Sequence, residues 1–180
     1  PFNSQISAGT FSFSSNIPVS GIALRGLVNE RSEFLVTTLP IANPDEINPA
    51  TISFPHMADG GGWTTQFALV NPTENTISGK VTYADQSGAP GESFDYTIPA
   101  RSSRRFKTQG SDAEARIGSA QVTPNGSDAT PVGIAIFSYK KDGITVTEAG
   151  VPSLPAGKGF QLFVEPAQDG LIRSGIAVRN

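Results

Sequence analysis

Two distant segments of the chain share one pattern. "PVSGIALRGLVNERSEFLVTTLP" at residues 18–40 aligns with "PVGIAIFSYKKDGITVTEAGVP" at residues 131–152. Gly21 lies over Gly133 and Pro40 lies over Pro152 at the same spacing, and the opening Pro18 lies over Pro131 at a spacing one residue longer. Repeated segments constrain the fold strongly, because each repeat adopts the same supersecondary structure and buries its apolar face against a neighbour.

A second match runs through the middle and the end of the chain. "FPHMADGGGWTTQFALVN" at 54–71 aligns with "FVEPAQDGLIRSGIAVRN" at 163–180, with a spacing close to that of the first match. The two matches together predict one complete unit at 52–159. Residues 1–43 then resemble the closing strands of a preceding unit, and residues 160–180 the opening strands of a further one.

The composition favours an all-β fold. Short runs rich in Val, Ile, Thr and Phe are separated by turn residues, with 19 Gly and 14 Pro, and no periodic helical run appears. Seven or eight strands in a unit of this size are typical of an immunoglobulin-like antiparallel β-sandwich. Within the complete unit we expect strands near 52–56, 64–71, 77–84, 92–99, 103–108, 116–123, 132–140 and 144–150.

The two end pieces present a physical problem. Residues 1–43 supply about three strands and residues 160–180 about two, and either piece alone exposes an apolar face and unpaired strand edges. The ends can pair with one another in cis, complete a sandwich in a second chain, or continue into a longer array. The sequence leaves these three arrangements open.

Several function classes are disfavoured by composition. The chain has no Cys, so disulfides and thiolate metal sites are excluded. Its net charge of −3 provides no general attraction for nucleic acid, and no apolar run reaches the ~18 residues of a membrane span. The single histidine, His56, has neither a nucleophile motif nor a metal-ligand partner nearby in the sequence. We therefore expect no catalytic residues, no metal and no cofactor.

The stretch "FPHMADGGGW" contains two candidate ligand residues. Three consecutive glycines allow a close backbone approach, and Trp63 could serve as a stacking platform for a sugar ring beside His56. The favoured alternative is a turn that leads into a strand, with Trp63 in the core or at a contact between units.

A basic cluster lies in "RSSRRFKT" at 101–108. Arg101, Arg104 and Arg105 could line a groove for an acidic polysaccharide, although charge that protects an edge strand explains them equally well. Glu30, Arg31 and Glu33 are most simply interpreted as a solvated hairpin tip.

Three stretches carry a resemblance to a known type of module. "FPHMADGGGWTTQFALVNPTENTISGKVTY", "IPARSSRRFKT" and "GIAIFSYKKDGITVTEAGVP" resemble a tandem-repeat β-sandwich module of uncharacterised secreted bacterial proteins. "ALRGLVNERSEFLVTTLP" is similar to a divergent copy of its closing segment. The resemblance implies an extracellular or cell-surface location and a tandem architecture, and it implies no chemistry.

Three hypotheses follow. The first is a non-enzymatic structural module for spacing, adhesion or strand-mediated assembly into filaments, with neighbouring units or identical subunits as partners. The second is a carbohydrate-binding accessory module that recognises extracellular polysaccharide. The third is an enzyme domain with an unfamiliar site near His56 and Asp59.

Overall fold

The computed structural model describes residues 9–165 and 173–180. Within these residues there are strands, turns and extended segments but no helix, and hence no helix that could cross a membrane. The strands are β1 (Ala23–Val28), β2 (Phe34–Leu39), β3 (Ile52–Asp59), β4 (Trp63–Val70), β5 (Ile77–Asp85), β6 (Pro90–Ile98), β7 (Ser103–Lys107), β8 (Arg116–Pro124), β9 (Val132–Lys141), β10 (Ile144–Pro152) and β11 (Leu154–Pro155).

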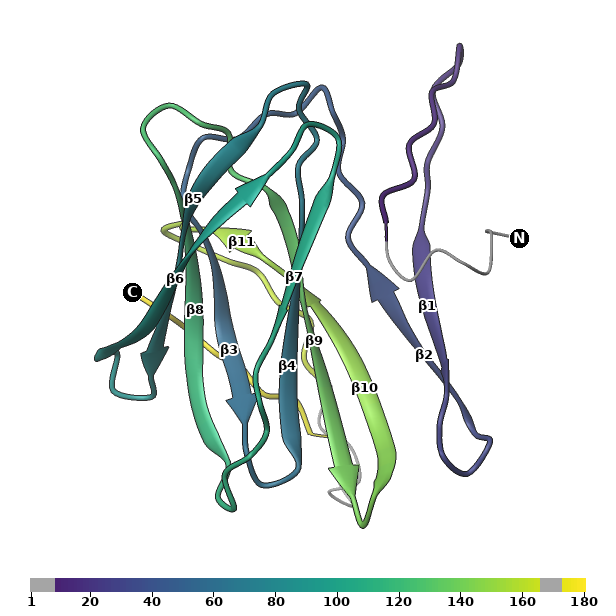
Figure 1. Ribbon diagram of the computed structural model, residues 1–180, viewed down its shortest axis with the longest axis vertical. Helices are drawn as coiled ribbons and strands as arrows, with labels where there is room; N and C mark the ends of the chain where they lie inside the picture. The colour runs from purple at the N-terminus through teal and green to yellow at the C-terminus, as the bar shows by residue number, and fades with distance from the viewer. Residues whose placement is uncertain (1–8, 166–172) are drawn as a thin grey trace.

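Strands β3 to β11 form two antiparallel sheets that pack face to face (Figure 1). One sheet has the order β10-β9-β4-β7, and the other has the order β11-β3-β8-β5-β6. All eight strands predicted for the complete unit are present, and each boundary lies within three residues of the predicted one. The all-β, antiparallel prediction is therefore confirmed.

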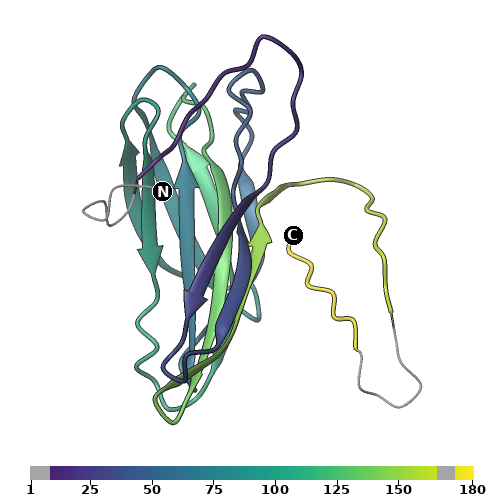
Figure 2. The same ribbon diagram turned by 90° about the vertical axis from the view of Figure 1, so that its right-hand side faces the viewer.

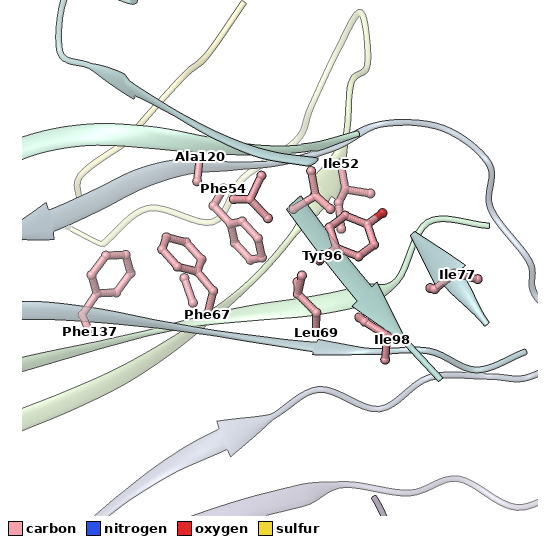
Figure 3. Close-up of a cluster of buried hydrophobic side chains, with 12 residues drawn as sticks. Ile52, Phe54, Phe67, Leu69, Ile77, Tyr96, Ile98, Ala120 and Phe137 are labelled. Atoms are coloured by element: carbon pink, nitrogen blue, oxygen red, sulfur yellow. The ribbon is translucent and has the colours of Figure 1, made fainter. Parts of the chain in front are cut away.

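The core lies between the two sheets (Figure 3). Phe54 of β3 meets Phe67 of β4 edge to face, with ring centroids 5.0 Å apart, and Tyr96 and Ile98 of β6 close the same cluster. The β4 and β9 strands are the central pair of their sheet, which explains the apolar runs at 67–70 and 132–137 within them.

The turn between β9 and β10 has the geometry that its sequence predicts. Asp142 and Gly143 both have positive φ angles, 50° and 82°. A type I′ turn requires this combination, and its twist matches that of the paired strands.

The β1–β2 hairpin forms a third layer. Figure 2 shows it in front of the sheet that contains β9 and β10, with β2 beside β10. The approach is close: a Cβ added to Gly150 of β10 would lie 2.8 Å from Thr37 Oγ1 of β2. Alternation along β1 turns Ala23, Arg25 and Leu27 toward the sandwich and leaves the side chains between them exposed.

The pairing register of this hairpin coincides with that of β9–β10. Ala23 pairs with Leu39 as Ala135 pairs with Val151, so both strands are shifted along the chain by the same amount. The same shift relates five consecutive pairs, from Ala23↔Leu39 to Leu27↔Leu35, and it ends at the bulge in β10.

The two ends contain fewer strands than predicted. Residues 9–22 form no strand, so the described part of 1–43 supplies two strands instead of three. Residues 160–165 and 173–180 are extended but belong to no sheet, and the rest of the two predicted strands lies outside the described residues. An extended segment becomes a strand only when a partner satisfies its backbone groups, and the described ends do not pair with one another.

We expect Phe67→Ala to lower the free energy of unfolding by about 3–5 kcal/mol, because it removes a fully buried ring and leaves a cavity. Chemical denaturation provides the measurement. Phe163→Ala is the matched control: its ring is 88% exposed, so the change should stay within about 0.5 kcal/mol. Equal losses in the two variants would contradict this account of the core.

Candidate functional site

The most extensive contact outside the core is the interface between the β1–β2 hairpin and β9–β10. Ile134 and Ile136 alternate with the core residues Ala135 and Phe137, so they point out of the sandwich. Both are nevertheless only 2% exposed. The hairpin lies over this apolar stripe: Thr37 of β2 and Ile134 approach the same point at Gly150, and Arg25 of β1 lines a small pocket with Ile136.

An ion pair crosses the interface. Arg25 of β1 pairs with Glu148 of β10, whose side chain is only 8% exposed. Partial burial strengthens this electrostatic attraction, because less water screens the two charges. Removal of either partner would leave the other charge partly buried and unpaired.

The hairpin tip binds the backbone edge of β10. Asn29 Nδ2 donates to the Thr145 carbonyl oxygen at 2.9 Å, and the Thr145 N–H donates to Glu30 Oε2 at 2.7 Å. Lys140 Nζ lies 2.7 Å from Glu30 Oε1. These contacts satisfy both backbone groups of Thr145, which would otherwise be open at the sheet edge.

Local hydrogen bonds hold the tip in shape. Asn29 Oδ1 accepts from the N–H groups of Arg31 and Glu33 at 2.9 Å each. The hydrogen bond from Lys140, followed by that from the Thr145 N–H, lowers the pKa of Glu30 to about 2. Hydrogen bonds from Asn29 and Arg31 also lower the pKa of Glu33.

Glu30, Arg31 and Glu33 are exposed, as a solvated hairpin tip requires, but this interpretation did not predict the remote contacts of Glu30. Its carboxylate contacts two residues that are remote in the sequence, Lys140 and Thr145. Asn29, which shares the contact with Thr145, was not among the candidate residues either. The local signal was an Asn at the start of a hairpin turn, which predicts the turn but not a remote partner.

His56 and Trp63 come together at the opposite, inner side of β9–β10. Both line an apolar cavity of about 450 Å3 between the sheets. The Trp63 ring is half-buried, with its centroid 4.8 Å from that of Tyr139, and His56 lies 5.2 Å from Phe137. The cavity offers few polar groups to orient a ligand. The cavity-lining residues are His56, Ala58, Trp63, Ala115, Ile117, Phe137, Ala149 and Val151.

The three glycines before Trp63 form a tight turn. Gly60, Gly61 and Gly62 have φ angles of 83°, 58° and 89°. Gly61 donates its N–H to the Asp112 carbonyl at 2.8 Å, and Gly60 and Trp63 bond one another. Because their N–H groups have protein partners, Gly60, Gly61 and Trp63 do not form an anion-binding cradle.

The three arginines do not converge with that cavity or on one another. They lie at or near β7, the edge strand opposite β10 in the same sheet. Arg101 occupies the preceding turn and bonds Glu74 at 2.9 Å. The Arg104 guanidinium lies 4.9 Å from the Phe106 ring centroid, while Arg105 points to the other sheet face.

No protein-family model, curated protein or solved structure matches the chain. Its function is therefore inferred from the contacts of these residues.

We expect the Thr145 amide to report the ionisation of Glu30. The pKa of Glu30 is lowered when the hairpin is docked, so the ionised carboxylate stabilises the docked state. This stabilisation is present above about pH 4.5 and is lost as the pH falls toward 2. The NMR shift of this amide should follow a transition near pH 2, which Glu30→Gln removes and Glu33→Gln retains. A midpoint near 4.5 would mean that Glu30 is solvated.

We expect the fluorescence of Trp63, the only tryptophan, to be poorly quenched by iodide and unchanged by oligosaccharides. Its ring packs against the core and Tyr139, so one face is not available to a sugar. Fluorescence titration with acidic and neutral glycans measures this. A saturable spectral shift that Trp63→Phe abolishes would favour carbohydrate binding instead.

Proposed function

We propose that the chain is a non-enzymatic structural module of a secreted or cell-surface protein. In this proposal residues 52–159 are one immunoglobulin-like repeat unit, and residues 1–43 and 160–180 are parts of neighbouring units. The module provides spacing and assembly through contacts between units. The observation that carries the proposal is the packing of the β1–β2 hairpin on the outer face of β9–β10.

The shared pairing register supports this view of the interface. Because β1–β2 repeats the register of β9–β10 at a constant spacing, the interface joins two equivalent hairpins. The outer face of β9–β10 is covered, whereas the corresponding face of β1–β2 is open. Its four large apolar side chains are each more than half exposed: Leu24, Val28, Phe34 and Val36. An open apolar face of this kind marks an interaction surface.

The distribution of exposed apolar residues supports the same conclusion. Seventeen of the 21 exposed large hydrophobic side chains in the described chain lie outside residues 52–159. The sandwich therefore buries its own apolar residues, while the two ends do not. Complete burial of one such side chain contributes about 1.5–3 kcal/mol, so the ends have a substantial driving force for association.

A carbohydrate-binding accessory role is the alternative. It would use the Trp63 and His56 cavity, because the arginines lie at the opposite edge of the sheet. The packing of the Trp63 ring against Tyr139 supports a structural role for this ring and favours the first proposal.

Light scattering over a concentration series tests the assembly role. We expect the mass to rise with concentration, because the open face of one copy can pack against the same face of a second copy. Leu24→Lys combined with Val36→Lys should reduce this association, since it places two charges in the buried contact.

The matched control is Ser93→Lys combined with Thr97→Lys. Both residues lie on the exposed side of β6, away from the hairpin, and the added charge is the same. This control should associate like the original chain. A chain that remains monomeric at every concentration would overturn the proposed role.

A further inference from the structure

The second edge of β1 has no strand partner in the described chain, where β2 is its one hydrogen-bonded neighbour. The equivalent strand, β9, has two neighbours, because β10 lies on one side and β4 on the other. By comparison with β9, the open edge of β1 lacks the neighbour that corresponds to β4.

The chain contains one segment that matches β4. Residues 173–180 align with residues 64–71, at the spacing of the second sequence match. Within them Ile176 corresponds to Phe67, and Val178 corresponds to Leu69. Phe67 and Leu69 are 1% and 0% exposed, whereas Ile176 and Val178 are 62% and 85% exposed. The tail therefore has the apolar pattern of β4 without its burial.

A hydroxyl contact relates the two segments independently of the alignment of apolar residues. Thr65 Oγ1 in β4 accepts from the Ala58 N–H at 3.0 Å and donates to the Ala58 carbonyl at 2.8 Å. Ser174, which corresponds to Thr65, makes a similar pair of contacts with the backbone of Glu165, at 2.8 and 3.2 Å, although Glu165 aligns with His56 and not with Ala58. The Ser174 hydroxyl therefore contacts the N–H and the carbonyl of one preceding residue, as the Thr65 hydroxyl does.

We propose that residues 173–180 of one copy pair antiparallel with the open edge of β1 in a second copy, in the register in which β4 pairs with β9. This inference rests on the proposed structural role and names the elements that join.

The register follows from the two sequence matches. Phe67 pairs with Ala135 and Gln66 pairs with Ile136 in the sandwich. The corresponding pairs are Ile176 with Ala23 and Gly175 with Leu24. The Ile176 side chain then lies on the face of β1 that packs on the sandwich, where it is buried from solvent.

The positions of the two elements favour pairing between copies. In Figure 1 the hairpin lies to the right of the sandwich, while the C-terminal end lies to the left. In Figure 2 the chain leaves the sandwich after β11, and the yellow C-terminal segment runs back toward it without joining a sheet. A donor and an acceptor on different parts of the surface form a heterologous contact, which extends into filaments when it does not close.

Disulfide trapping tests the register, because the chain has no cysteine of its own. We would mix two single variants, Ala23→Cys and Ile176→Cys, under mild oxidation. Directly opposed residues lie close enough for a disulfide, so we expect a mixed dimer on a non-reducing gel. Leu24→Cys with Gly175→Cys is a second pair. Hydrogen-bonded and non-hydrogen-bonded pairs alternate along an antiparallel ladder, so the two test pairs include one of each kind.

The control mixes Ala23→Cys with Ala177→Cys, whose side chain points to the opposite face. We expect at most a trace of mixed dimer from it. Equal trapping of control and test pairs, or no trapping from either test pair, overturns the inference. A double variant that links only within one chain at high dilution also overturns it, since pairing would then be in cis.

Light scattering distinguishes a failure of the strand pairing from a failure of the proposed structural role. A chain that associates without trapping retains the structural role and refutes the strand pairing. A chain that neither associates nor traps refutes both.

Discussion

The burial of β9 on both of its faces is the constraint on which the rest of the structure depends. Its inner side chains, Ala135 and Phe137, belong to the core, and its outer side chains, Ile134 and Ile136, lie beneath the β1–β2 hairpin. One strand therefore ties three layers together. A strand covered on both sides must be apolar throughout, as "GIAIF" is. Without the hairpin, the side chains of Ile134 and Ile136 would face water, which would favour their association with another apolar surface.

The polar contacts of the hairpin give this cover a defined position. An apolar stripe alone allows a sheet to slide, because the hydrophobic effect is not directional. The hairpin is fixed along β10 by the Arg25–Glu148 pair and by the two hydrogen bonds of Thr145, which accepts from Asn29 and donates to Glu30. They also occupy an exposed strand edge, which limits uncontrolled pairing there. The combination of apolar cover and polar alignment is typical of a specific interface.

The sandwich was predictable because its signals are local, whereas the candidate interface was not. Turn residues such as Asp142-Gly143 and alternating strands determine the elements within a few residues of chain. The contact between Glu30 and Thr145 joins residues 115 positions apart. Nothing near Glu30 distinguishes a docked carboxylate from a solvated one. Trp63 is intermediate: its place at a strand start was predictable, but the packing of its ring against Tyr139 depends on the pairing of β4 with β9.

The amino-acid sequence alone established the all-β class, the positions of eight strands and two internal matches of nearly equal spacing. These features follow from side-chain periodicity and turn chemistry, which act over short distances. The packing of the hairpin on the outside of β9–β10, and the extended state of the described tail without a sheet partner, emerged only in the folded chain. This division arises because strand pairing and face packing join residues far apart in the chain. Their outcome depends on which edges and faces remain open after the core has formed.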